Sequence, residues 1–173
     1  MANTTFDGPV RSKNGFINIG PGMTKSLSAD TVLTVQEHAG RILLLNDADG
    51  KFTLPAINVN ADSAVAGPGS DPNNLNNIGA SFYFYIETAA TDLDIKTDGT
   101  DKFTGAVMLA VDDGAKKAFV PAAANDVMTF DGGTAGGLAG SVVQVTAVDT
   151  NNYLVHNSLV IATGTIVTPF ANA

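Results

Sequence analysis

The sequence predicts an all-β protein: a jelly-roll-like antiparallel β-sandwich of about eight to eleven strands with an extended N-terminal arm. Short stretches in which large apolar and polar residues alternate recur between turn signals along most of the chain. No window of about eleven residues or more has the i, i+3, i+4, i+7 apolar pattern of an amphipathic helix. A length of 173 residues suits one domain. We therefore expect an arm over residues 1–25 and a single sandwich domain over residues 26–173.

The first 25 residues have the composition of an extended docking arm. Turn signals follow one another closely, and isolated large apolar residues stand between them. A disordered tail is usually depleted in such residues, so an arm docked on its own domain or on a neighbouring subunit is favoured over the alternative of a frayed terminus. The arm residues that we expect at an interface are Phe6, Pro9, Val10, Arg11, Phe16 and Ile17.

Three strands and a long loop are predicted next. Residues 31–36 and 41–46 are strand candidates, and the second is apolar on both faces, which is typical of a strand inside a sheet. A third strand at residues 51–54 ends at Pro55, because proline cannot donate to a strand ladder. Residues 58–77 are rich in Asn, Gly, Pro, Asp, Ser and Ala and predict a long surface loop, either a passive insertion or a binding loop.

The strongest strand signal lies in residues 80–97. Side chains of a strand alternate between its two faces, so Phe82, Phe84 and Ile86 share one face and Tyr83 and Tyr85 the other. After a short break, residues 93–96 alternate in the same way. This pattern predicts a core hairpin, with the two tyrosines as the candidate subunit interface.

The C-terminal half predicts the remaining strands. The candidates are residues 103–111, 117–120, 126–130, 141–148, 152–156 and 159–163. Between them, residues 131–140 contain five glycines. A phosphate-binding loop would need a following Lys-Ser/Thr and a helix, whereas a strand follows here. We therefore expect a loop or bulge in which one backbone segment passes close to another.

Residues with catalytic or metal-binding chemistry are sparse. The chain has no cysteine, and His38 and His156 lie outside any metal-ligand spacing, so we expect ordinary surface or turn histidines. No G-x-S-x-G motif occurs. The Asp47-x-Asp49-Gly50 run lacks the first and last ligands of a calcium loop. The sequence thus predicts no enzyme, no cofactor, no metal site and no small-molecule substrate. A glycan-active enzyme, a further alternative, would need two carboxylates that converge in a cleft.

The distribution of charge along the chain restricts the kinds of molecule that the protein can bind. Residues 1–25 have three basic side chains and one acidic side chain, a net charge of +2, whereas residues 26–173 have six basic and sixteen acidic, a net charge of −10. Nucleic acids are bound through arrays of cationic contacts to phosphate, so the body would repel them. No apolar run approaches the roughly 20 residues of a membrane helix. We expect neither a nucleic acid nor a membrane as partner, and the small basic N-terminal arm is the one segment where contact with a nucleic acid stays an alternative.

The opening TTFDGPVRSKNGF, residues 4–16, resembles the start of capsid decoration (cement) proteins of tailed phages, particularly marine ones. The body is similar to theirs in the order of its elements: an apolar strand, a Thr-Leu-Pro, a glycine before an aromatic strand, a Leu/Ile-x-Ile strand, a glycine-rich hairpin and a Val-rich pair. Here these are RILLLN, Thr53-Leu54-Pro55, Gly79 with SFYFYIE, Leu93-x-Ile95, DGGTAGGLAG, and SVVQVTAV with NYLVH.

The resemblance implies a structural virion protein on the outer surface of a capsid, assembled in the host cytoplasm. Its partner would be the major capsid protein, whose subunits a homotrimer of this chain would clamp, with the arm reaching onto the shell or a neighbouring subunit. The alternative is a phage fibre or receptor-binding β domain, in which residues 58–77 contact host glycans.

Overall fold

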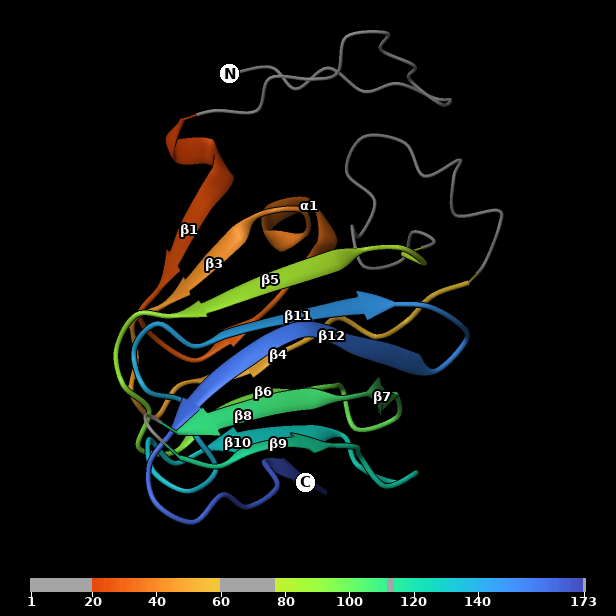
Figure 1. Cartoon of the computed structure of the whole chain (residues 1–173). Coiled ribbons are helices and arrows are strands. Elements are labelled where there is room, and N and C mark those ends of the chain that lie inside the picture. Colours follow the sequence, from red (N-terminus) through yellow and green to blue (C-terminus); the bar gives the residue numbers. More distant parts are fainter. Residues whose placement is uncertain (1–19, 60–76, 112–113, 173) are drawn as a thin grey trace, which may run out of the picture.

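The computed structural model describes residues 20–59, 77–111 and 114–172, so most of the arm and most of the 58–77 loop lie outside the described residues. Strands make up 44% and helices 5% of the described chain, which confirms the all-β class. The strands form two sheets that pack on a shared apolar core (Figure 1). Within the described residues, no helix has the length and apolar character needed to cross a bilayer.

The larger sheet has eight strands. In chain order they are β1 (Thr24–Leu27), β3 (Ile42–Leu45), β5 (Ser81–Ile86), β7 (Lys102–Gly105), β8 (Val107–Val111), β9 (Lys116–Phe119), β11 (Val142–Ala147) and β12 (Asn152–Ala162). Their order in space is β1-β3-β5-β11-β12-β8-β9, and β7 also pairs with β12.

The smaller sheet has five strands. They are β2 (Thr31–Val32), β4 (Lys51–Thr53), β6 (Leu93–Lys96), β10 (Val127–Phe130) and β13 (Phe170–Ala171), in the spatial order β13-β10-β6-β4-β2. Two short helices complete the described elements: the 3-10 helix η1 (Pro21–Met23) before β1, and α1 (Val35–His38) between β2 and β3.

The core lies between the inner faces of the two sheets. The central strands of the larger sheet alternate between buried and half-buried residues, which places every second side chain inside. The smaller sheet supplies the opposite wall. The large inward side chains with no exposed surface include Phe82, Phe84, Val143, Val145 and Tyr153 from the larger sheet and Phe52, Leu93, Ile95, Met128 and Phe130 from the smaller one.

Strand pairing differs from the prediction in two ways. Strands β5 and β6, predicted as a hairpin, lie in different sheets: β5 pairs with β3 and β11, whereas β6 pairs with β4 and β10. Their apolar faces therefore meet across the core instead of side by side. The sheets are also mixed and not antiparallel, because the pairs β1/β3, β3/β5, β2/β4, β4/β6, β12/β7 and β12/β8 are parallel.

The predicted strand at residues 31–36 is wrong in its second half. Only Thr31–Val32 forms a strand, and α1 follows at Val35–His38. The Thr34 side chain accepts a hydrogen bond from the Glu37 backbone N–H at 3.3 Å, which caps the helix. A Thr-x-x-Glu spacing is the signature of a helix start, and here it outweighs the β-branched residues around it.

The glycine-rich segment confirms the predicted close approach of backbones. A Cβ on Gly132 would collide with the carbonyl oxygen of Ala90, and a Cβ on Gly137 would lie 2.6 Å from Cβ of Phe130. Both glycines also have positive φ angles, of 68° and 98°. At these two positions the segment approaches its neighbours at a distance that only glycine permits.

Candidate interaction surface

The outer face of the eight-stranded sheet differs from the rest of this acidic protein. None of its eight strands contains an Asp or Glu, although the chain has 17 acidic residues. The smaller sheet, in contrast, presents Lys51, Asp94 and Lys96 on half-buried or exposed positions of β4 and β6. The strands of the larger sheet thus bring no carboxylate to the outer face, which lowers the electrostatic cost of contact between this face and another acidic molecule.

Strand register arranges this outer face in two rows. The first row runs Thr24, Ile42, Tyr83, Gln144, His156 across β1, β3, β5, β11 and β12. The second row runs Ser26, Leu44, Tyr85, Val142, Leu159 across the same strands. The second row is apolar over four successive strands, and Leu159 at its end is 50% exposed. We call these ten residues the outer-face rows.

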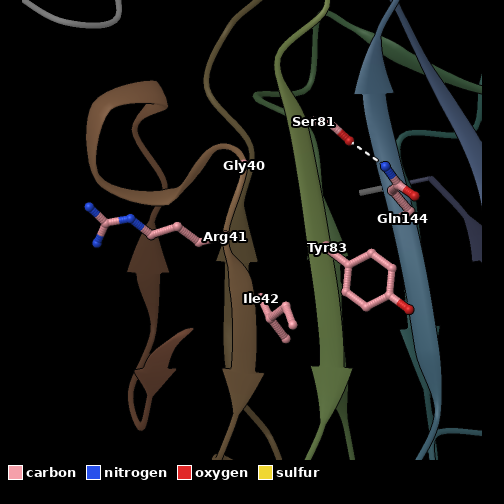
Figure 2. Close-up of a pocket in the computed structure, with 6 residues that line it drawn as sticks. All are labelled: Gly40, Arg41, Ile42, Ser81, Tyr83 and Gln144. Atoms are coloured by element: carbon pink, nitrogen blue, oxygen red, sulfur yellow. Dashed lines mark hydrogen bonds between the residues drawn. The ribbon is translucent and has the colours of Figure 1, made fainter. Parts of the chain in front are cut away.

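A shallow pocket of about 390 Å³ opens on the first row (Figure 2). Its lining consists of Gly40, Arg41, Ile42, Ser81, Tyr83 and Gln144. Ile42 and the Tyr83 ring lie on either side of β5, and Ser81 and Gln144 close the end nearest Gly40. Arg41 is the charged residue among those named, and its side chain runs away from the Tyr83 ring. Among the described residues, none that lines the pocket has a carboxylate, so this part of the chain does not bring the paired acids of a glycosidase together here.

A hydrogen-bond network holds the polar end of the pocket. Gln144 Nε2 donates to Ser81 Oγ at 2.7 Å, and the Thr146 hydroxyl donates to the same oxygen at 3.0 Å. Thr146 Oγ1 also lies 2.8 Å from His156 Nε2. Asn157 Nδ2 donates to Gln144 Oε1 at 2.8 Å. The Gln144 amide is therefore fixed at both ends, and its orientation does not depend on a ligand.

Asn157 reaches Gln144 because β12 is irregular at that point. The register between β11 and β12 shifts between Val142 and Gln144, and Asn157 has a positive φ of 44°. Asn tolerates this conformation better than most residues. Such bulges commonly redirect a side chain, and here the redirected side chain supports the pocket.

The sequence-predicted site residues fall into two groups. Tyr83 and Tyr85 lie on the outer face as predicted, and both are half-buried. The arm residues Phe6, Pro9, Val10, Arg11, Phe16 and Ile17 lie outside the described residues. The structure brings the tyrosines together with Ile42, Leu44, Gln144 and Leu159, which sequence reasoning did not select.

The two histidines differ from each other. His156 belongs to the half-buried network above. His38 is buried, with 4% exposure, so the prediction of a surface or turn position is wrong for it. Its Nδ1 accepts the Thr34 backbone N–H at 2.9 Å and lies 3.2 Å from the Thr34 carbonyl oxygen. Nε2 is buried and has no hydrogen-bond partner among the described residues. Burial is the main cause that lowers the pKa of His38, and the Lys25 charge adds to it.

A second buried group holds the base of the 58–77 loop. Asp101 is 4% exposed and accepts the Ile57 N–H at 2.7 Å, and burial raises the pKa of this carboxyl. Asn77 donates to the Ala56 carbonyl and accepts from the Asn58 N–H, each at 2.8 Å. These bonds join the two ends of the loop. In the described part of the chain, no three His, Cys, Asp or Glu residues come together in a group that could hold a metal ion.

The Thr146–His156 contact does not make a nucleophile site. In a catalytic triad, a third residue orients the histidine through its other ring nitrogen. Among the described residues, no hydrogen bond to Nδ1 of His156 is present.

Comparison with protein-family models, with curated proteins and with solved structures found no match for the chain.

Proposed function

We propose that this chain is a non-enzymatic structural protein that decorates the outer surface of a tailed-phage capsid and clamps its major capsid protein subunits as a homotrimer. The observation that carries the proposal is the outer face of the eight-stranded sheet, free of Asp and Glu in a chain with a net charge of −8. Because residues 4–16 resemble the arms of decoration proteins, we propose the capsid shell as the partner.

The charge distribution favours contact between copies through the outer-face rows. Like charges brought together across an interface cost several kcal/mol, so two acidic molecules associate most readily through faces without acids. The row from Leu44 through Tyr85 and Val142 to Leu159 offers apolar surface at this location. Burial of such surface stabilises an interface by about 25 cal/mol per Å² before the costs of association. This supports the tyrosines as part of a subunit interface.

The edge strand β1 supports the role of the arm. It begins at Thr24, inside the range assigned to the arm, and pairs with β3 over four residues. Lys25 forms a 2.7 Å ion pair with Glu37 of α1. Strand β1 thus lies at the edge of the same sheet that carries the outer-face rows, and an arm that precedes β1 would contact the shell beside a clamped subunit.

The proposal is tested by deletion of residues 2–19, which leaves every described element intact. We expect the shortened protein to keep its far-UV circular dichroism spectrum and to stop co-sedimenting with empty capsids of the phage that carries its gene. A variant with the arm intact and Lys96→Gln on the smaller sheet is the control, and it should still bind. If the shortened protein co-sediments with unchanged affinity, the arm does not attach the protein and the proposal is wrong.

A receptor-binding or fibre domain that recognises glycans is the second candidate function. The observation that favours it is the pocket on the first outer-face row, which combines the Tyr83 ring with the amide of Gln144 and the hydroxyl of Ser81. Apolar walls with a few fixed polar groups are typical of ligand sites. Electron microscopy of labelled virions would separate this candidate, at the tail, from decoration of the head.

A further inference from the structure

The pocket on the first outer-face row offers two kinds of surface to a ligand. Ile42 and Tyr83 provide apolar contact, and Ser81 and Gln144 provide hydrogen-bonding groups at one end. Gly40 stands at the rim, and a Cβ placed there would meet no atom within 4 Å, so the mouth is open on that side. The volume of about 390 Å³ falls within the range of small-molecule sites.

The directions of the hydrogen bonds determine which polar atoms remain available. When Thr146 Oγ1 accepts from Nε2 of His156 and donates to Ser81 Oγ, Ser81 Oγ accepts two hydrogen bonds, from Gln144 Nε2 and from Thr146, which uses both of its acceptor positions. Its own O–H proton has no acceptor among the described residues. Gln144 Oε1 is occupied by Asn157, whereas the second N–H of Gln144 has no acceptor in the described structure. The polar end of the pocket therefore offers donors.

We propose that this pocket binds the acetamido group of an N-acetylated hexosamine. The acetamido carbonyl accepts from the Ser81 hydroxyl and the Gln144 amide, and its methyl group lies against Ile42. The sugar ring lies on the Tyr83 side chain, where its C–H groups contact an aromatic surface. This deepens the second candidate function, on which it rests for the assumption of a glycan ligand.

The direction of the Arg41 side chain favours this neutral group over an acidic sugar. A buried carboxylate needs a cation or several donors, and the nearest cation, Arg41, is directed away from the Tyr83 ring (Figure 2). An acetamido group matches two donors and an apolar wall without an unpaired charge. A sugar that lacks it would leave the Ser81 and Gln144 donors without an acceptor, and such unpaired polar groups weaken binding.

The network around the pocket reduces the cost of binding. Gln144 is held by Ser81 and Asn157, and Ser81 is held by Thr146, which His156 contacts in turn. Side chains that are already fixed lose little conformational freedom when a ligand arrives. Three of the five network residues belong to neighbouring central strands, β5 and β11, and this makes the geometry of the donors rigid.

The test is a nuclear magnetic resonance titration of the full-length protein with N-acetylglucosamine and N-acetylgalactosamine, with glucose and galactose as matched sugars without the acetamido group. We expect saturable shifts at the Gln144 side-chain amide and at Tyr83 with the acetylated sugars alone. Ser81→Ala should weaken binding by about three- to tenfold. Thr53→Val, on the smaller sheet, is the control and should leave binding unchanged, and the spectra themselves show whether each variant is folded.

The possible results separate this inference from the function on which it rests. Equal binding of glucose and N-acetylglucosamine would overturn the acetamido assignment and leave glycan recognition standing. Absence of shifts with all four sugars would overturn both. Acetamido-specific binding that Ser81→Ala leaves unchanged would place the sugar elsewhere and overturn the proposed pocket.

Discussion

The phenolic O–H of Tyr153 donates to the carbonyl oxygen of Pro55 at 2.6 Å, a bond that joins strand β12 to the segment entering the 58–77 loop. Tyr153 has no exposed surface, so this hydrogen bond forms in the core. Burial raises the pKa of the Tyr153 hydroxyl above its usual value of 10, so the group is a neutral donor at pH 7. The loop base is therefore attached to the sandwich by a core residue.

Replacement of Tyr153 by Phe should destabilise the protein. The change leaves the Pro55 carbonyl buried without its donor, and the expected cost is about 1–3 kcal/mol of unfolding free energy. Urea denaturation measures it. Tyr85→Phe, in which the altered hydroxyl lies on a half-buried outer-face position, is the control, with an expected change within about 0.5 kcal/mol. Equal losses for the two variants would show that the Pro55 bond contributes nothing specific.

His38 should make the protein less stable in mild acid. The folded pKa of His38 lies below its usual 6.5. The unfolded chain therefore binds more protons just below pH 6.5, and stability falls as the pH drops through that value towards the folded pKa. The charged groups that act on the ring are Lys25 of β1, Glu37 of α1 and Arg41. Of these, the two cations further oppose protonation.

The variant His38→Asn isolates this effect, because the Asn side-chain oxygen can accept the Thr34 N–H but cannot titrate. We expect its unfolding free energy to change less between pH 7 and pH 5 than that of the wild type. Asp101 acts in the opposite direction: its folded pKa is raised above 3.8, so it lowers stability as the pH rises above that value. If His38→Asn loses as much unfolding free energy between pH 7 and pH 5 as the wild type, groups other than His38 cause that loss.

Substitution of Gly132 and of Gly164 by alanine separates the energetic cost of a strained backbone from the cost of a steric collision. Both have a φ of 68°, but a Cβ on Gly132 collides with the Ala90 carbonyl, whereas a Cβ on Gly164 meets nothing within 4 Å. Gly164→Ala should cost about 1 kcal/mol, the penalty of a positive φ. Gly132→Ala should cost at least about 1–3 kcal/mol more, because a backbone segment has to move. Thermal denaturation of both variants checks the difference, and equal costs would contradict the close approach.

Leu159→Asp should disrupt the proposed contact between copies. The substitution places a carboxylate in the apolar outer-face row and should weaken self-association by at least about tenfold. Val167→Asp is the matched control, since Val167 is 44% exposed outside the eight-stranded sheet. Analytical ultracentrifugation measures the molecular mass of each variant. A wild-type protein that sediments as a monomer, or a Leu159→Asp variant with unchanged mass, would exclude this face as the subunit interface.

Local patterns in the sequence predicted strand positions and faces well. The alternation of Phe82, Tyr83, Phe84 and Tyr85 gave the correct inner and outer sides, because a strand has a fixed period of two. The same alternation does not specify which strand lies alongside. The pairing of β5 with β3 and β11 depends on contacts between residues far apart in the chain, and this is why the hairpin prediction is wrong.

The outer-face site was only partly predictable. The two tyrosines were identified, but the run of residues 41–46 is apolar on both faces, so the sequence could not distinguish Ile42 and Leu44 outside from Leu43 and Leu45 inside. The sequence predicted an interruption at Asn157, between strands at residues 152–156 and 159–163, whereas the structure has one strand, Asn152–Ala162, with a shifted register against β11. The contact of Asn157 with Gln144 depends on that shift and was not predicted. The burial of His38 could have been predicted in part, because the Thr34-x-x-Glu37 spacing indicates the start of the short helix that contains His38.

The parallel pairing of β1 with β3 has a mechanical consequence. A pull on residue 20 along the axis of β1 would load all four residue pairs of β1 and β3 in shear, as in a lap joint, instead of peeling them apart one after another. A tether attached in this way yields at higher force than one that unzips. A protein attached through its N-terminal segment would thus resist a load along the axis of β1 better than a load that peels β1 from β3.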